Sequence, residues 1–171
     1  PGTALRKLGV QPEEITDVIL THLHWDHAGN NHLFPNARFY VQRTELEEVL
    51  HPPVQMFASS YDVPAVLKTK YELLDGDCLL WEGIRVVTTP GHTLGSQSVV
   101  VDTDSGPHVL VGDLIGLYEC YEHDPMFYNG IHIDLREYTA SLEKVKSIGG
   151  IILPGHDYKV LNDRKYPKDM Q

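Results

Sequence analysis

A seven-residue segment near the start of the chain carries four side chains of the kinds that bind metal ions. It reads Thr21-His22-Leu23-His24-Trp25-Asp26-His27. In an extended chain, residues two apart point to the same face, so the imidazoles of His22 and His24 can chelate one ion. Asp26 and His27 follow at a turn, where they can present a carboxylate and a third imidazole to a neighbouring ion. The spacing therefore predicts one short segment that serves two metal ions, rather than a solvated or core histidine cluster.

Three further candidates each follow directly after an apolar strand. The segments are Val86-Val87-Thr88-Thr89-Pro90-Gly91-His92, Val109-Leu110-Val111-Gly112-Asp113 and Ile151-Ile152-Leu153-Pro154-Gly155-His156. In a layered α/β protein the strand ends gather along one edge, so we expect His92, Asp113 and His156 to converge. Taken alone, each would more often be an ordinary loop residue. Their shared context favours a role as ligands.

The seven candidates divide into two sets around one carboxylate. A first ion would be bound by His22, His24 and His92, and a second by Asp26, His27 and His156. Asp113 can bridge the two ions because a carboxylate offers two oxygens. Imidazoles and carboxylates without thiolates suit zinc, manganese, iron or cobalt and do not choose among them; zinc is the ion that we expect. Two such ions can activate a water near neutral pH, which predicts a hydrolase without a serine or cysteine nucleophile.

Strands and helices that position these residues can be predicted from periodicity and turn residues. We expect strands over 17–21, 37–41, 78–81, 84–89, 98–102, 109–111 and 151–153. Helices are expected at 4–8, from Thr44 with a capping box on Thr44 and Glu47, and over 134–148, with a loop or broken helices over 51–66. The remaining histidines lack ligand spacing and are expected at the surface or in loops; they are His32, His51, His108, His123 and His132.

Composition limits the class of protein. The chain has 171 residues, 42% of them hydrophobic, which predicts one globular domain over 1–171 with a core of its own. A net charge of -10 argues against nucleic-acid or anionic-membrane partners. The two cysteines form no metal-site pattern, and a cytoplasmic location is the default expectation. We find no membrane-spanning run and no signal segment. The oligomeric state stays open, with a homodimer among the alternatives.

These motifs resemble the metallo-β-lactamase superfamily, through the HxHxDH segment and the later His, Asp and His. Within it the chain looks most like the N-acyl homoserine lactone lactonases. The similar stretches are His24-Trp25-Asp26-His27-Ala28-Gly29-Asn30, Val41-Gln42-Arg43-Thr44-Glu45, Thr89-Pro90-Gly91-His92-Thr93-Leu94-Gly95-Ser96-Gln97-Ser98 and Gly155-His156-Asp157. The resemblance implies an α/β fold of the αββα sandwich type, and the opening of an acyl lactone or ester ring, as in quorum quenching, by a hydroxide that bridges two metal ions.

The resemblance also implies roles for individual residues. One ion would polarise the lactone carbonyl and the other would take the leaving alkoxide, to which Asp26 or Asp113 could return a proton. The lactonases place a tyrosine three residues after the bridging aspartate, where this chain has Gly116. Tyr118 is close enough in sequence to substitute as a catalytic residue, although lid packing is the alternative reading for its aromatic ring.

The amino-terminal part departs from the family pattern. The superfamily sandwich begins with several strands that should precede Leu5, and we do not find them in this sequence. We therefore expect a domain that is partial at its amino terminus, with all seven ligands present. The missing strands would leave an unpaired sheet edge, which puts the stability of the fold in doubt.

Other members of the superfamily provide competing readings. A thioesterase of the glyoxalase II type uses the same ligands and is the main alternative, but the segment after Asp113 lacks the Cys-Gly-Arg continuation of that family. A phosphodiesterase of the tRNA-processing type is disfavoured by the acidic charge. β-Lactamases and flavo-di-iron proteins use other ligands at the positions of Asp113 and His24. A non-catalytic metal-binding module would bind metal yet be inert to lactones, thioesters and phosphodiesters.

Overall fold

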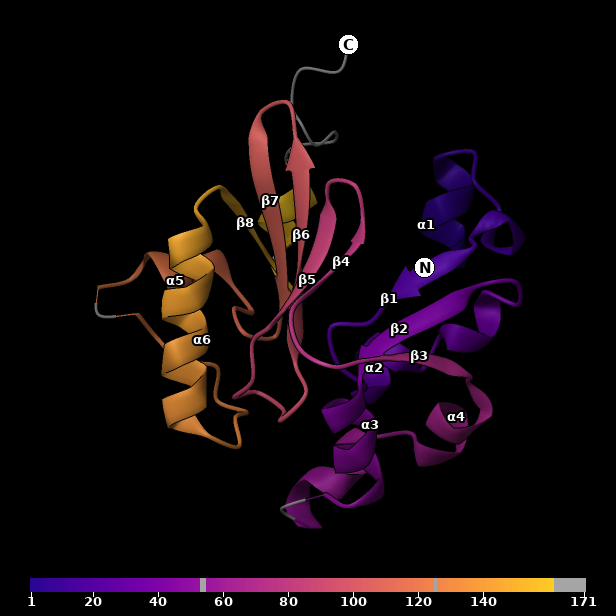
Figure 1. Cartoon of the computed structure of the whole chain (residues 1–171), viewed down its shortest axis with the longest axis horizontal. Coiled ribbons are helices and arrows are strands. Elements are labelled where there is room, and N and C mark those ends of the chain that lie inside the picture. Colours follow the sequence, from indigo (N-terminus) through magenta and orange to yellow (C-terminus); the bar gives the residue numbers. More distant parts are fainter. Residues whose placement is uncertain (53–54, 125, 162–171) are drawn as a thin grey trace. The chain divides into compact units, whose positions relative to one another are not determined.

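The computed structural model describes residues 1–52, 55–124 and 126–161, without the side chains of residues 55–57. The chain divides into two compact units, Pro1–Asp75 and Gly76–Gln171. Each unit has its own sheet (Figure 1). Each also has its own hydrophobic core. The mixed α/β class predicted from the sequence is confirmed, whereas the extent of the domain stays a prediction.

The first unit contains a three-stranded parallel sheet in the order β1-β2-β3. Its strands are β1 (Asp17–Ile19), β2 (Arg38–Gln42) and β3 (Tyr71–Leu74). Its helices are α1 (Gly2–Lys7), α2 (Trp25–Ala28), α3 (Arg43–Leu50) and α4 (Val63–Lys68), with short 3-10 helices η1 (Pro12–Glu14), η2 (Asn31–Leu33) and η3 (Gln55–Ser60). Phe39 and Val41 are buried on β2 and belong to one core with Val49 of α3 and Val66 of α4. Alternate residues of β2 thus face the helices.

Two details of the first unit differ from the prediction. The capping box on Thr44 is wrong, because β2 runs directly into α3 and the helix begins one residue before Thr44. Gln42, with extended backbone angles, takes the N-cap position, and no side chain caps the helix there. The sequence also did not indicate β3, a strand of only four residues that are all at least partly exposed. The broken helices expected over 51–66 are confirmed for the described part by η3 and the start of α4.

The second unit contains a five-stranded sheet in the order β4-β5-β6-β7-β8. The strands are β4 (Cys78–Trp81), β5 (Ile84–Thr88), β6 (Gln97–Thr103), β7 (Gly106–Gly112) and β8 (Ile151–Pro154), and the helices are α5 (Tyr118–Glu122), α6 (Leu135–Ile148) and the 3-10 helix η4 (Tyr158–Leu161). Neighbouring strands run antiparallel from β4 to β7, whereas β7 and β8 are parallel. The parallel pair brings the residues after these two strands to the same edge of the sheet.

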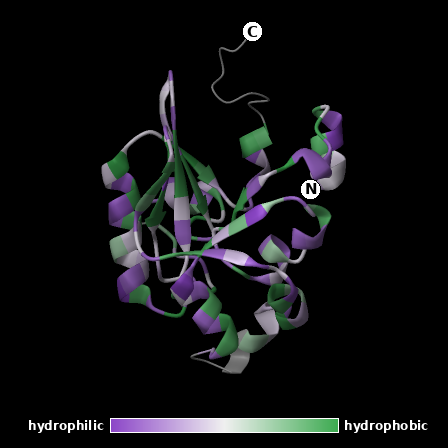
Figure 2. Ribbon diagram, turned by 45° about the vertical axis from the view of Figure 1, so that its right-hand side comes forward, coloured by the Kyte–Doolittle hydropathy of each residue, from purple (hydrophilic) through white to green (hydrophobic). Residues whose placement is uncertain are grey.

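Helix α6 packs on one face of the five-stranded sheet, and its limits agree with the predicted range. Asp134 is its N-cap and accepts hydrogen bonds from two main-chain N–H groups of the first turn. Tyr138, Leu142 and Val145 lie at helical spacing and are buried against valines of the sheet. Figure 2 shows hydrophobic residues concentrated on the strands of this sheet and an alternation of hydrophobic and hydrophilic residues along the helix.

His108 corrects the prediction for the unassigned histidines. It was expected at the surface or in a loop, but it is 3% exposed. The reason is that β7 begins at Gly106, three residues earlier than predicted, so that His108 pairs with Val101 inside the sheet. Its Nδ1 lies 3.3 Å from the carbonyl oxygen of Gly106.

The described residues also bear on membrane insertion. In the ranges 1–52, 55–124 and 126–161, no helix combines the length and the apolar character needed to cross a bilayer.

Candidate metal centre

The first cluster of candidate ligands lies in the first unit, after β1. The chain continues from β1 to His24, which is the N-cap of α2, and Asp26 and His27 lie within that short helix. The ring centroid of His22 lies 4.7 Å from that of His24 and 4.0 Å from that of His27. A ligand nitrogen of His22 is within 4.8 Å of one on each of these two residues. The segment thus gathers three imidazoles.

Burial distinguishes the members of this cluster. His22 is 1% exposed and His24 is 6% exposed, whereas Asp26 is exposed at the surface. Asp26 Oδ2 lies 3.5 Å from His27 Nε2. The hydroxyl of Thr21 lies 3.1 Å from His22 Nδ1, and a bond of this kind to one ring nitrogen orients an imidazole that binds a metal. The cluster combines two buried imidazoles with a more exposed carboxylate and imidazole.

The second cluster lies in the second unit and joins the ends of three strands. Asp113 follows β7, His156 follows β8 by two residues, and His92 follows β5 by four. Asp113 Oδ2 is 3.5 Å from His92 Nε2, and Asp113 Oδ1 is 3.0 Å from His156 Nε2. The side chain of Asp113 is 11% exposed and that of His92 is 1% exposed. Each carboxylate oxygen therefore faces a different imidazole, and the predicted convergence of these three residues is present.

Two glycines allow the second cluster to form. Gly91 has φ 131°, and a Cβ there would lie 2.4 Å from the Cα of Tyr138 on α6. A Cβ on Gly155 would lie 2.7 Å from the carbonyl oxygen of Gly112. The N–H of Gly155 donates to that same oxygen at 3.1 Å, which holds the end of β8 beside the end of β7. Any larger residue would separate the strand ends that bring Asp113 and His156 together.

The orientation of His92 is set by a main-chain group. Its Nδ1 lies 2.7 Å from the carbonyl oxygen of Ile131, an acceptor, so Nδ1 carries the proton. The neutral ring then has its lone pair on Nε2, the nitrogen that faces Asp113. Metal-binding histidines commonly donate their second N–H to a carbonyl in this way.

Tyr118 lies at the start of α5 and is already engaged. Its hydroxyl donates to the carbonyl oxygen of Ile152 on β8 at 2.9 Å, and its N–H donates to Asp157 Oδ2 at 2.8 Å. These two bonds connect α5 to the strand that ends near His156. A contact with substrate would require the hydroxyl to leave Ile152, so the catalytic role of Tyr118 stays a prediction.

Two buried tyrosines, Tyr61 and Tyr138, remain protonated at neutral pH. Burial, followed by the charges of Glu45 and Glu48, raises the pKa of Tyr61, whose ring centroid is 4.9 Å from that of His24. Burial also raises the pKa of Tyr138 to about 12. Its hydroxyl donates to the carbonyl oxygen of Leu114 and accepts the N–H of Asn129 at 3.2 Å. Both phenols therefore act as hydrogen-bond donors.

Sequence reasoning missed Glu45, Glu48 and Tyr61, which pack beside the first cluster. Glu45 and Glu48 are buried, and Tyr61 donates to Glu48. A run of glutamates on a helix is typical of a solvated face. The signal that could have identified them is helical spacing, because Glu45 lies four residues before the apolar Val49 and three before Glu48 on the same helix.

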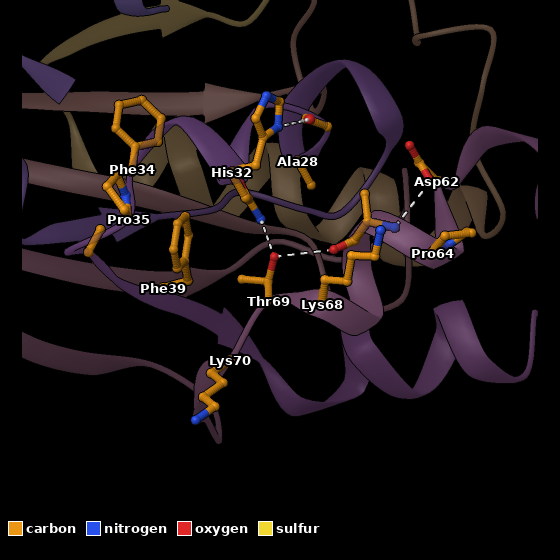
Figure 3. Close-up of a pocket in the computed structure, with 14 residues that line it drawn as sticks. Ala28, His32, Phe34, Pro35, Phe39, Asp62, Pro64, Lys68, Thr69 and Lys70 are labelled. Carbon is orange, nitrogen blue, oxygen red and sulfur yellow. Dashed lines mark hydrogen bonds between the residues drawn. The ribbon is translucent and has the colours of Figure 1, made fainter. Parts of the chain in front are cut away.

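A separate cleft of about 590 Å³ lies in the first unit between η2, β2 and α4 (Figure 3). Its lining includes the aromatic residues Phe34 and Phe39 and the charged residues Asp62 and Lys68. Its first lining residue in the sequence is Ala28, which directly follows the histidine-rich segment. None of the predicted ligands is among its lining residues. The side chain of Asn31 donates to Thr69 at 3.5 Å across it.

The donor set fits a divalent metal ion. Both clusters offer imidazole nitrogens and carboxylate oxygens, the ligands that zinc, iron and manganese accept. In the second cluster a carboxylate with one oxygen directed to each of two imidazoles suits a shared ligand, and in the first cluster a threonine hydroxyl orients a buried histidine.

Comparisons with known proteins agree with this chemistry. The sequence matches the metallo-beta-lactamase superfamily over residues 1–156. It is 32% identical over 159 residues to an N-acyl homoserine lactonase of a Bacillus species, covering 90% of this chain and 60% of that one. It is 29% identical to a probable metallo-hydrolase of Methanocaldococcus jannaschii, with coverages of 94% and 66%.

Solved structures give the same picture. A Bacillus thuringiensis lactonase variant with N-decanoyl-L-homoserine bound at its active site has a TM-score of 0.77 and 32% identity, covering 94% of this chain and 63% of that one. An N-acyl homoserine lactone hydrolase with its product N-hexanoyl-L-homoserine at the catalytic metal centre has a TM-score of 0.77 and 31% identity, with the same coverages. This chain spans about 60% of the length of the lactonases that it matches. The match to the superfamily covers most of the chain, and the chain belongs to the metallo-β-lactamase superfamily.

Proposed function

We propose that the two clusters bind one pair of divalent ions and that the protein opens the ring of N-acyl homoserine lactones. The observation that carries the proposal is Asp113, which directs one oxygen to His92 and the other to His156. Such a carboxylate suits a bridge between two metals. The lactonases among the relatives support the substrate class.

The seven ligands keep the roles that the sequence predicts. A first ion would be held by His22, His24 and His92 and a second by Asp26, His27 and His156, with Asp113 as a ligand of both. Zinc is the preferred ion, with iron, manganese or cobalt as alternatives. When bound, such ions supply Lewis acidity toward the lactone carbonyl and activate a water as the nucleophile near neutral pH.

Carboxylates of the chain would then transfer the proton that the leaving oxygen needs. The opening of the ring leaves an alkoxide, and Asp26 or Asp113 returns a proton to that oxygen. Asp26 is exposed and can exchange protons with solvent, whereas Asp113 is nearly buried. The Tyr118 hydroxyl would donate a hydrogen bond to the substrate carbonyl after breaking its bond to the carbonyl oxygen of Ile152. We place the reaction in the cytoplasm, on a small acyl lactone or ester, and a homodimer stays a prediction.

The test is hydrolysis by metal-loaded protein, followed as proton release. A long-chain N-acyl homoserine lactone, a glutathione thioester and a chelator-treated control are compared. Opening of the lactone alone, abolished by the chelator, is the expected result. Cleavage of the thioester alone would assign the protein to the glyoxalase II-like branch, and metal-loaded protein inert to both substrates would contradict the proposal.

A further inference from the structure

Two buried carboxylates lie on α3, the helix that packs beside the histidine-rich segment. Glu45 is 0% exposed and Glu48 is 2% exposed. Removing an ionised carboxylate from water costs several kcal/mol, and an aliphatic side chain of similar size would avoid that cost. We therefore look for the role of these two glutamates in the hydrogen bonds that their carboxylates accept, because an aliphatic side chain could not accept them.

Glu45 holds the main chain of the ligand segment. Its Oε1 accepts the N–H of Leu23 at 2.8 Å. Leu23 is the residue between His22 and His24, and its own side chain is 0% exposed in the core of the first unit. A rotation of this peptide would move both imidazoles together. The bond from Glu45 therefore fixes the part of the backbone from which the two ligands project.

Glu48 acts on the ring of His24 through a tyrosine. It lies one turn after Glu45 on α3 and accepts the hydroxyl of Tyr61 at 3.0 Å. The ring of Tyr61 lies against that of His24, with centroids 4.9 Å apart and planes inclined at 50°. The carboxylate thus fixes the phenol, and the phenol limits the space in which the imidazole can turn.

We propose that Glu45, Glu48 and Tyr61 are positioning residues that hold His22 and His24 in the geometry that binds a metal ion. The inference rests on the proposed function only in that these two histidines are metal ligands. Outer partners of this kind commonly change metal affinity by about 10- to 100-fold when they are removed. Helix α3 would then hold both the backbone between His22 and His24 and, through Tyr61, the ring of His24.

Two variants separate the hydrogen bond that Glu45 accepts from the space that its side chain fills. Glu45→Gln keeps an oxygen that can accept the Leu23 N–H, whereas Glu45→Leu fills the space without an acceptor. Glu47→Gln, on the exposed face of the same helix, is the matched control. Zinc affinity of the full chain is measured by competition with a chromophoric chelator. We expect Glu45→Leu to weaken it by about 10-fold or more and the other two variants by less than about 3-fold.

A merely structural role gives a different result. Each variant, together with Tyr61→Phe and Glu48→Gln, is unfolded by denaturant with and without zinc. Weaker ligand positioning reduces the stabilisation added by zinc, by about 1.4 kcal/mol for each tenfold loss of affinity. A structural role lowers the stability of both forms equally. Unchanged zinc affinity in Glu45→Leu and Tyr61→Phe would overturn the inference.

These measurements need no substrate, so they are independent of the proposed lactonase. If the wild-type chain binds zinc and the variants bind it less tightly, the inference holds even when no lactone is opened. If the wild-type chain opens lactones while the variants keep full zinc affinity, the proposed function holds and the inference fails. A wild-type chain that does not bind zinc would overturn the inference directly.

Discussion

Asp113 Oδ1 lies 3.0 Å from His156 Nε2 because β7 and β8 run parallel and end at the same edge of the sheet. The other oxygen of Asp113 faces His92 at 3.5 Å. One carboxylate thus connects the ends of three strands that are separated by long stretches of sequence.

Replacing Asp113 by Asn tests the role of this carboxylate. The amide keeps the shape but removes the charge and one acceptor oxygen, so it cannot bridge two cations. We expect zinc affinity to fall by about 10- to 100-fold and lactone turnover to fall at least as far. Asp104→Asn, at the exposed turn between β6 and β7, is the control. Full activity in Asp113→Asn would exclude a bridging role.

Gly91→Ala is expected to be strongly destabilising. The φ of 131° is unfavourable for alanine, and its Cβ would overlap the backbone of Tyr138. We predict a loss of about 3 kcal/mol in the free energy of unfolding, measured with denaturant. Gly106→Ala separates strain from overlap, since Gly106 has φ 102° with nothing within 4 Å of an added Cβ. Its loss should be about 1 kcal/mol, and equal losses would contradict the role of the close contact.

Asp77 connects α6 to the sheet and gives stability a dependence on pH. Burial opposes ionisation of Asp77, but hydrogen bonds from Lys144 and Thr88 outweigh it and hold its pKa below the ordinary 3.8. Because the folded pKa is lowered, the contribution is fully present above about pH 4 and is lost as pH falls through the folded value.

The corresponding variant is Asp77→Asn. At pH 7 we expect it to lower the free energy of unfolding by about 1 kcal/mol, a modest value because both partners of the ion pair with Lys144 are partly exposed. The difference from wild type should shrink as the pH is lowered below about 4. A difference that stays constant from pH 7 to pH 3 would show that the charge of Asp77 is not responsible.

Tyr118→Phe tests the predicted catalytic role. Loss of the hydroxyl bond to Ile152 should cost about 1 kcal/mol of stability whatever the role. If the hydroxyl also contacts the substrate carbonyl, kcat should fall by about 10-fold or more, corresponding to about 1.4 kcal/mol or more of transition-state stabilisation. A stability loss with unchanged kcat would remove Tyr118 from the mechanism and leave it as a packing residue.

The sequence predicted those parts of the molecule that depend on local spacing. The histidine-rich segment, the strand-end position of His92 and the limits of α6 follow from residue periodicity and capping residues, which act over a few positions. The gathering of Asp113 and His156 followed from the rule that strand ends share an edge. No single one of these signals required knowledge of a distant residue.

The failures concern residues whose position depends on where a strand or helix begins or on what packs against it. His108 resembles a loop histidine until β7 is extended to Gly106 and paired with β6. Thr44 resembles an N-cap, but the direct passage from β2 into α3 gives that position to Gln42. Glu45 and Glu48 resemble solvated residues, and only the packing of α3 beside Leu23 and Tyr61 buries them.

The most direct measurement of the central claim is the zinc content and affinity of the chain and of its His92→Ala variant. If the two clusters bind one pair of ions, the wild-type chain holds about two zinc ions. Loss of His92 then lowers the affinity for the ion that His22 and His24 also bind. The predicted result is a fall in affinity of about 100-fold for that ion, with lactone opening abolished. Retention of two ions at unchanged affinity would contradict a shared binuclear centre.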